Sequence, residues 1–566
     1  MHSPAAQGKR MSYLRQPIVA ALLSSVLLWL SFYPVNWGWV GWLAIVPLLS
    51  LVRSSNVNQA ALKTYWYKPW QYGPIGAAWV GGLVFCLAAF QWIRIASTPM
   101  IAIWLSLALA MSLQYPLVIW ILRRFDRYLH MPLWLAAPAV WTSLEWFRAN
   151  LHIGFAWYFL GQSQHEQITL IQIADLAGVY GVSFLVVMVN AVVCGVIEML
   201  ATRRWWRPSL WAGLVVTALC IVASIGYGHH ALSQTHYRPG PRLAIVQCNL
   251  EQDIRNDPNE ADTMNRHLLQ LIERAALLKA DLIICPETSL AMWYMRIRPD
   301  APQAKITAQW REQDQQTQIV FKRLSEEWQT EALIGMVAVL LEKEGERRYN
   351  AAVHFDAQGR EKGLYAKIYC LPFGEYIPME KVLPFLKWLS PYDYEYSTAI
   401  GEERTLFDVK SYSYAVLICY EDTVPQLAPQ FMRTPRPPTF FVNISNDGWF
   451  KGCEEHEQHW VTAKFRAIEC RRALVRSVNM GVSGVVDSCG RAVVLPDQVQ
   501  TLSEGKARAS VLAASVPVDD RASVFVAWGE CWSVVVWGLV LFALLCTLGM
   551  EMVEARRGPT AAANSV

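Results

Sequence analysis

The chain has 566 residues, of which 54% are hydrophobic and only 17% are charged, and 26 of them are Trp. This length is too great for one ordinary domain, and this composition is too apolar for a wholly soluble protein. The net charge of +4 is small, and neither a Lys/Arg-rich block nor zinc-ligand spacing occurs, which argues against nucleic acid as a partner.

Uncharged stretches fill the first part of the chain. Residues 16–52 carry no charge, which leaves room for two membrane helices that turn around Tyr33-Pro34-Val35-Asn36. Five further stretches are uncharged or nearly so: 71–93, 95–122, 128–144, 176–197 and 208–227. Together they predict seven spans in an N-terminal membrane domain, residues 1–230. We expect the first span to be an uncleaved anchor, because no small-x-small cleavage site follows it.

The basic residues predict the orientation of these spans. An eighth apolar stretch, 531–550, lies in a C-terminal segment, 524–566. If the N-terminus is cytoplasmic, the cytoplasmic segments carry most basic residues near the spans: Lys9, Arg10, Arg15, Arg53, Lys63, Lys68, Arg123, Arg124, Arg127, Arg203, Arg204, Arg207, Arg556 and Arg557. The opposite short loops offer only Arg94 and Arg148. This asymmetry predicts a multi-pass membrane protein with both termini cytoplasmic and residues 242–518 on the opposite side, in a periplasm or an equivalent space.

Residues 242–518 have a different pattern, in which short β-like runs alternate with polar helical ones. Residues 242–250 and 281–285 are predicted strands on either side of an amphipathic helix, 261–280, which gives a β-α-β unit. Further elements are expected in chain order: a strand pair at 332–341 and 349–355, strands at 414–418 and 439–444, a helix at 454–474, and a strand region at 475–494. This alternation predicts an α/β sandwich.

Three stretches in this part of the chain carry residues that suit acyl transfer at predicted strand ends. Cys419 follows the apolar run 414–418, Glu287 follows 281–285 within Pro286-Glu287-Thr288, and Lys367 stands in Tyr365-Ala366-Lys367-Ile368-Tyr369. Each one alone is usually a core or loop residue. Together they supply a nucleophile, a general base and a cation for the oxyanion that forms when a thiolate attacks a carbonyl.

In this order and membrane setting, the three stretches resemble the Glu-Lys-Cys triad of the nitrilase (carbon-nitrogen hydrolase) superfamily and, more narrowly, the apolipoprotein N-acyltransferase family. The resemblance covers nearly the whole chain and is supported by three further segments: 371–378 (LPFGEYIP), 443–450 (NISNDGWF) and 466–469 (RAIE). It implies an αββα nitrilase-like sandwich attached to a multi-pass α-helical membrane domain.

The resemblance also implies a function and roles. Cys419 takes an acyl chain from a phospholipid as a thioester and passes it to the N-terminal amine of a diacylglyceryl-cysteine lipoprotein, in ping-pong order. Glu287 is the general base, and Lys367 and a backbone N–H near Tyr420 hold the oxyanion. Glu375, Tyr420 and Glu421 are supporting residues. No metal or dissociable cofactor is implied, and we expect a monomer.

Several other residues carry expectations of their own. His456 and His459 are expected at the exposed start of a helix, without a catalytic role, because acidic residues surround them. The aromatic segments 290–315 and 382–396 either lie on the bilayer or cover the sandwich core. Asn256 stands where the family commonly has Trp, which leaves any lipid-holding role of that ring in doubt. Of the 12 Cys, six others accompany Cys419 in residues 242–518, and no spacing identifies disulfide pairs.

Two alternatives share the same triad. A membrane-anchored amidase or nitrilase would use water as the acceptor, although a hydrolase of soluble amides has no need of eight helices. A non-catalytic nitrilase-like scaffold would bind without reaction, but the complete set of Glu287, Lys367 and Cys419 argues against it.

Overall fold

The computed structural model describes residues 17–54, 73–151, 154–205, 207–380, 382–389, 398–494 and 508–557. The chain divides into two compact units: Met1–Gln91 with Trp104–His230 and Trp528–Val566, and Trp92–Ile103 with Ala231–Ala527. The domain limits proposed from the sequence, 1–230, 242–518 and 524–566, stay predictions, as does the orientation. Several residues behind that orientation lie outside the described ranges: Lys9, Arg10, Arg15, Lys63 and Lys68.

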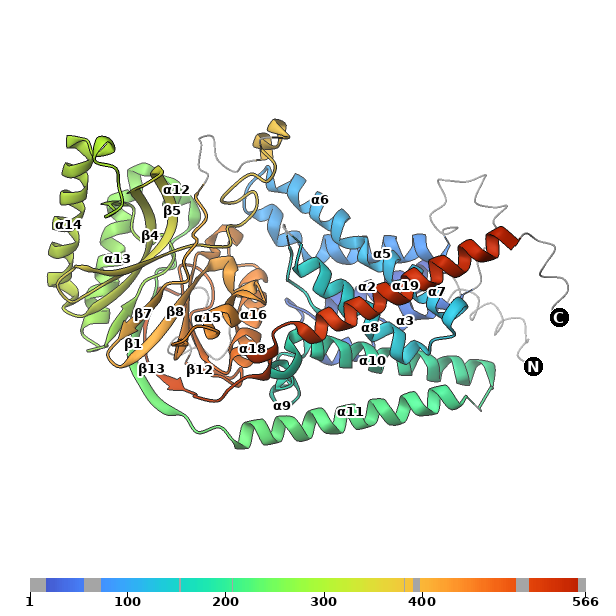
Figure 1. Cartoon of the computed structure of the whole chain (residues 1–566). Coiled ribbons are helices and arrows are strands. Elements are labelled where there is room, and N and C mark those ends of the chain that lie inside the picture. Colours follow the sequence, from blue (N-terminus) through green and yellow to red (C-terminus); the bar gives the residue numbers. More distant parts are fainter. Residues whose placement is uncertain are drawn as a thin grey trace, which may run out of the picture. The chain divides into compact units, whose positions relative to one another are not determined.

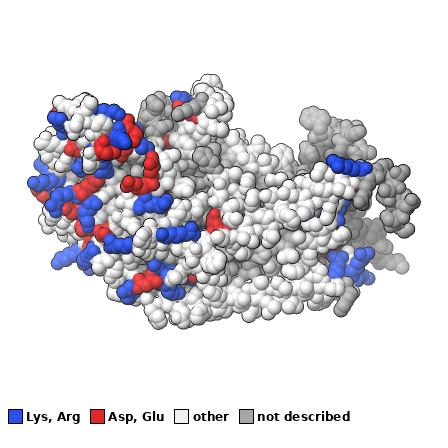
Figure 2. Space-filling view, viewed as in Figure 1, with Lys and Arg blue, Asp and Glu red and all other residues white. Residues whose placement is uncertain are grey.

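The first unit consists of apolar helices. Their bounds are α2 (Pro17–Leu30), α3 (Val46–Leu49), α5 (Pro74–Ala89), α6 (Met100–Ser112), α7 (Gln114–Arg124), α8 (Leu133–Ala149), α9 (Ile168–Ile171), α10 (Ala174–Thr202), α11 (Pro208–Ser233) and α19 (Cys531–Arg557). Figure 2 shows that the surface over these helices is almost free of charged residues, whereas charges of both signs cover the other unit. Large apolar side chains such as Leu219, Val222 and Phe542 are exposed on α11 and α19. Such a surface is suited to lipid.

Four helical segments are long and apolar enough to cross a membrane: Met100–Leu129, Ala174–Thr202, Pro208–Ser233 and Cys531–Glu554. They coincide with four of the predicted spans. The stretches 16–52 and 71–93 instead contain the shorter apolar helical segments Pro17–Leu30, Gly38–Val52 and Pro74–Ala89. The number of eight spans therefore stays a prediction.

The second unit contains two β-sheets (Figure 1). One sheet has the order β13-β1-β2-β4-β5-β6, with β3 also paired to β4, and the other has the order β12-β11-β10-β9-β8-β7. The strands of the first sheet are β1 (Arg238–Gln247), β2 (Leu282–Ile284), β3 (Trp293–Ile297), β4 (Glu331–Glu342), β5 (Gly345–Phe355), β6 (Glu361–Ala366) and β13 (Ser510–Val518). Those of the second are β7 (Leu406–Val409), β8 (Tyr412–Ile418), β9 (Phe440–Ser445), β10 (Ala473–Val478), β11 (Gly484–Val486) and β12 (Ala492–Val494).

The two sheets pack face to face between helices. One core cluster joins residues of both sheets, among them Ile245, Ile284, Val416 and Val442. A second cluster joins the outer face of the first sheet to α13 (Ala261–Ala276) and α14 (Ala308–Trp328). Helices α15 (Leu427–Met432) and α16 (Glu455–Cys470) cover the second sheet (Figure 1). The unit is therefore an αββα sandwich, and the predicted α/β fold of this part is confirmed.

Most of the predicted elements of this unit are present. Strands β1 and β2 are parallel and flank α13, and β4 and β5 form the predicted strand pair, which is antiparallel. The region 475–494 differs, because it holds the end of β10 and two short antiparallel strands, β11 and β12. Gly481 and Gly484 have φ values of 134° and 155°, which break the continuous strand that the apolar pattern predicted.

The segment Trp92–Ile103 is an unexpected part of the second unit. It connects two apolar helices in the sequence, yet the Trp92 ring packs edge-on against Phe450, with centroids 4.8 Å apart. Sequence periodicity could not reveal this contact, because the two rings are far apart in the chain.

Candidate active site

Cys419 lies where a strand ends in a tight turn. Strand β8 ends at Ile418, and the 3-10 helix η10 (Cys419–Thr423) begins with Cys419 at φ 52°, a left-handed conformation that is uncommon for a side chain of this kind. Strained conformations of this type cluster at functional sites. Cys419 is half-buried, whereas residues 413–418 of the strand before it are buried.

Glu287 follows the parallel strand β2 and is 6% exposed. Its Oε1 accepts a hydrogen bond from Asn350 Nδ2 at 2.6 Å, and its Oε2 accepts one from the Asn446 backbone N–H at 2.8 Å. Lys367 Nζ lies 3.5 Å from the same Oε1. These contacts fix both oxygens of the carboxylate.

Lys367 follows β6 and is held by two carboxylates. Its Nζ lies 2.8 Å from Glu375 Oε2, which also accepts a hydrogen bond of 2.7 Å from the Leu371 backbone N–H. Burial lowers the pKa of Lys367, but Glu375, Cys419 and Glu287 outweigh it and raise that pKa well above the usual value. Lys367 therefore stays a cation in the site, and Glu375 contacts it directly, while the supporting role expected of Glu375 stays a prediction.

Asn350 links the two carboxylates and was not anticipated. Its Nδ2 donates to Glu287 Oε1 and, at 2.7 Å, to Glu375 Oε1. It lies within β5, and its own carbonyl accepts from the Lys367 backbone N–H at 2.9 Å. The sequence could have pointed to Asn350, because it is an amide inside an apolar strand and a buried amide needs polar partners.

Glu421 connects the Lys367 segment to the Cys419 turn. It is fully buried and accepts hydrogen bonds from the backbone N–H groups of Ile418 at 2.7 Å, Ile368 at 2.7 Å and Tyr369 at 3.0 Å. Burial raises its pKa to about 7 although these donors oppose the rise. These contacts allow Glu421 to hold the two segments together. The role of the backbone N–H near Tyr420 stays a prediction.

The charges around Cys419 keep its sulfur protonated at rest. Burial raises the pKa of the Cys419 thiol, Glu287 and Asp447 raise it further, and Lys367 and a hydrogen bond from Ser445 lower it. The resulting pKa of the thiol lies well above its usual value. A thiol of this kind attacks only when a base removes its proton, and Glu287 lies within the same set of interacting groups.

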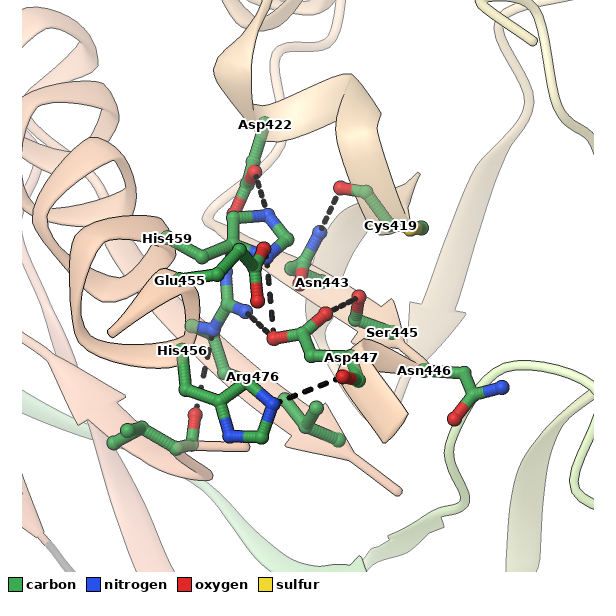
Figure 3. A network of polar contacts seen from close by, with 12 residues as sticks. Cys419, Asp422, Asn443, Ser445, Asn446, Asp447, Glu455, His456, His459 and Arg476 are labelled. Carbon is green, nitrogen blue, oxygen red and sulfur yellow. Dashed lines mark hydrogen bonds and ion pairs between the residues drawn. The ribbon is translucent and has the colours of Figure 1, made fainter. Parts of the chain in front are cut away.

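His456 and His459 correct the expectation of an exposed helix start. They are 0% and 2% exposed, on a helix α16 whose described residues are all buried. His459 Nε2 lies 2.7 Å from Asp422 Oδ1, and its Nδ1 lies 3.2 Å from Asp447 Oδ2 (Figure 3). Two of the acidic residues that predicted solvent exposure, Glu455 and Glu457, are themselves only 1% and 3% exposed.

Arg476 completes this buried network. Its Nη1 lies 2.5 Å from Asp422 Oδ2 and its Nη2 lies 3.3 Å from Asp447 Oδ2. Asp447, Glu455 and His459 have ligand atoms within 4.8 Å of one another, as a metal site requires. However, Arg476 and His459 already pair with Asp447, and burial raises the pKa of Glu455 well above its usual value, so we interpret the group as a network of ion pairs and hydrogen bonds.

The charge on His459 should make the stability of the protein fall as the pH rises into the alkaline range. Burial and Arg476 lower its pKa, but Asp422 and Asp447 raise it to about 10. Because the folded pKa exceeds the usual 6.5, the stabilisation from His459 is complete below pH 6.5 and is lost as pH rises toward 10, at about 1.4 kcal/mol for each step of one in pH. The melting temperature of wild type minus that of His459→Gln should therefore shrink between pH 6.5 and 10. A constant difference would contradict the charged assignment.

Asn256 has polar contacts where the family commonly has an aromatic ring. It ends α12 (Gln252–Asn256), and its Oδ1 accepts from Gln252 Nε2 at 2.8 Å. Gln252 Oε1 accepts in turn from Asn446 Nδ2 at 2.9 Å, and the Asn446 backbone binds Glu287. Asn256 thus belongs to a hydrogen-bonded chain that leads to Glu287.

The two aromatic segments differ in whether they cover the core of the sandwich. Tyr294 is 1% exposed and packs in the outer core cluster, so this part of 290–315 covers the sandwich. In the other segment, Phe385 and Trp388 are 57% and 85% exposed, so they do not cover the core. Tyr392 lies outside the described residues.

Comparison with known proteins relates both units to one family. The family model described as apolipoprotein N-acyltransferase N-terminal domain matches residues 24–192, and that described as carbon-nitrogen hydrolase matches residues 242–524. Proteins named apolipoprotein N-acyltransferase are similar over most of their length. That of Geobacter metallireducens is 29% identical over 96% of this chain and 95% of its own, and that of Methylococcus capsulatus is 28% identical over 84% and 87%. That of Chlorobaculum tepidum is 27% identical over 92% and 95%.

The carbon-nitrogen hydrolase match covers half of the 566 residues. It includes Glu287, Lys367 and Cys419, while the other match covers the helical unit from α2 to α10. The chain belongs to the carbon-nitrogen hydrolase family, and it is similar to proteins named apolipoprotein N-acyltransferase over most of its length.

Proposed function

We propose that this protein transfers an acyl chain from a membrane phospholipid, through a thioester on Cys419, to the N-terminal amine of the diacylglyceryl-cysteine of apolipoproteins. The observation that carries the proposal is the convergence of Cys419, Glu287 and Lys367 at the strand ends of one sandwich, in a chain that also has helices long and apolar enough for a membrane. The names of its relatives supply the lipoprotein acceptor.

The first half-reaction forms the thioester. Glu287 takes the Cys419 proton, the sulfur attacks the ester carbonyl of the phospholipid, and an S–C bond forms. The ester C–O bond then breaks, and the proton passes from Glu287 to the oxygen of the departing lysophospholipid. Lys367 and a backbone N–H near Tyr420 stabilise the oxyanion between these steps.

The second half-reaction uses the same residues in reverse. The N-terminal amine of the lipoprotein attacks the thioester carbonyl while Glu287 accepts an amine proton, an amide bond forms, and the proton returns to the departing sulfur. Glu375 and Asn350 position Lys367 and Glu287 throughout, which agrees with their contacts at 2.8 and 2.6 Å. The enzyme is regenerated as the thiol and needs no metal or dissociable cofactor.

The proposal places the reaction at a bilayer. The helical unit anchors a monomer in a bacterial inner membrane, with the termini cytoplasmic and the sandwich on the periplasmic side. The exposed Phe385 and Trp388 suit the lipid headgroup region, where aromatic residues are favoured. They are therefore candidates for the guidance of acyl chains toward Cys419.

The decisive experiment is intact-protein mass spectrometry of wild type and Cys419→Ala, each mixed with phospholipid in the absence of an acceptor. We expect one added acyl mass on wild type alone, which hydroxylamine removes and a diacylglyceryl peptide accepts as an amide. Cys370→Ala is a matched control, because Cys370 is a buried thiol near Glu375 that the mechanism does not use.

Other outcomes separate the remaining functions. Failure of folded wild type to acquire an acyl mass from several phospholipids would exclude a lipid donor. Hydrolysis of small amides by that same protein would then indicate an amidase, and the absence of both reactions would indicate a binding scaffold.

A further inference from the structure

The Ser445 hydroxyl lies between two possible acceptors. Ser445 ends β9 and is fully buried. Strand β9 runs parallel to β8 with Ile444 opposite Ile418, so Ser445 and Cys419 are the next residues along the two strands. The Ser445 Oγ donates to Asp447 Oδ1 at 2.6 Å, and Ser445 is also one of the groups that lower the pKa of the Cys419 thiol. Figure 3 shows the three residues around the ends of these strands.

A serine hydroxyl has one proton and can donate it to only one acceptor at a time. When Cys419 is a thiol, the proton is best placed on the Asp447 carboxylate, as the structure has it. Once Glu287 removes the thiol proton, the sulfur is a largely buried anion that needs a donor. Rotation of one hydroxyl supplies this donor without movement of the backbone.

Asp447 can release this donor because it has other partners. Arg476 Nη2 lies 3.3 Å and His459 Nδ1 lies 3.2 Å from its Oδ2. Its backbone carbonyl lies 2.9 Å from His456 Nε2. Of the acidic groups around it, Glu455 also faces His459, at 3.5 Å. The buried positive charge thus holds Asp447 in place whichever way the hydroxyl points.

We propose that Ser445 is a positioning residue whose hydroxyl passes its hydrogen bond from Asp447 to the sulfur of Cys419 as the thiolate forms. The S–H bond breaks, its proton goes to Glu287, and an O–H···O contact is exchanged for an O–H···S contact. His459 and Arg476 act through Asp447, because they set how firmly it holds the hydroxyl. The inference rests on the proposed function only in taking Cys419 as the nucleophile.

This exchange gives two neighbouring residues opposite effects on the thiol. Loss of the Ser445 hydroxyl removes a donor from the thiolate and should raise the pKa of Cys419. Loss of the Asp447 charge in Asp447→Asn removes a repulsion and leaves only a weaker, neutral acceptor to compete for the hydroxyl, and should lower that pKa. The other charges that face the thiol, on Glu287 and Lys367, are the same in both variants. A merely structural disturbance would not produce opposite signs.

The test is the rate of alkylation of Cys419 by iodoacetamide from pH 6 to 10, in the full-length protein in detergent, read by mass spectrometry of the Cys419 peptide. At pH 7 we expect alkylation about three to ten times slower in Ser445→Ala, and faster by a similar factor in Asp447→Asn, since a pKa change of about one alters the thiolate fraction tenfold. Ser413→Ala is the matched control. Ser413 is a buried serine in β8, and its Oγ donates to the Pro437 carbonyl at 3.1 Å.

The outcomes separate this inference from the proposed function, because alkylation needs no lipid. Equal rates in Ser445→Ala and Ser413→Ala, or equal slowing in Ser445→Ala and Asp447→Asn, would overturn the inference. If Asp447→Asn does not fold, His459→Gln replaces it. Loss of the imidazolium should then slow alkylation, and an unchanged or faster rate would contradict the exchange. Expected alkylation without acyl transfer from phospholipid would instead overturn the proposed function alone.

Discussion

Replacement of Lys367 by Met is expected to slow thioester formation at Cys419 by at least about 10²–10³, the usual cost of the loss of one oxyanion donor. A second effect adds to the first. Lys367 Nζ lies 3.5 Å from Glu287 and 2.8 Å from Glu375, and without it two buried carboxylates share only the Asn350 amide. One carboxyl should then stay protonated to higher pH, because like charges at short range disfavour joint ionisation. A protonated Glu287 cannot accept the thiol proton.

The measurement is the rate of acyl-mass gain on the protein as a function of pH. Lys367→Met should show both the lower rate and an acidic limb displaced to higher pH. Lys362→Met is the matched control, because Lys362 also belongs to the β6 region but pairs with Glu331 at 2.8 Å on the surface. Similar rates in the two variants, with similar melting temperatures, would remove Lys367 from the mechanism.

The α/β fold of residues 242–518 could be predicted because local patterns decide it. The apolar runs at β8 and β9, and the helical spacing of Leu268, Leu271 and Ile272 in α13, each reflect one buried face. The helix bounds of the apolar N-terminal part could be predicted less precisely. An uncharged stretch such as 16–52 permits a long span, but composition alone does not say where a helix breaks.

The site could be predicted in part, for a similar reason. Glu287, Lys367 and Cys419 each follow a strand and match a motif, so their types and order were readable. Asn350 and Ser445 lie inside strands, and their importance depends on which strands become neighbours. The burial of His459 was not predicted, because the acidic residues near it in the sequence suggested solvent. Arg476, which lies in β10, supplies the positive charge that pairs with Asp422 and Asp447 in this buried network. Such long-range pairings leave no local pattern in a single sequence.

Glu287→Gln tests the base most directly, because it removes the charge and keeps the shape. Oε1 of Glu287 accepts from Asn350, and Oε2 accepts from the Asn446 N–H at 2.8 Å. An amide can accept at only one of these positions, so one donor loses its partner. Without a base, thioester formation should fall by about 10²–10⁴, the range usual for general acid–base catalysis.

The same substitution should have the opposite effect on simple alkylation of the nucleophile. The Glu287 charge raises the pKa of the Cys419 thiol, so its removal lowers that pKa and should increase the rate with iodoacetamide near pH 8. Slower acylation together with faster alkylation would indicate the loss of a base. A site that has lost its structure would instead slow both reactions. Glu361→Gln is the control, since Glu361 is a partly buried carboxylate paired with Arg296 and Arg298 rather than with the triad. Acylation by Glu287→Gln at the rate of Glu361→Gln would show that another group takes the thiol proton.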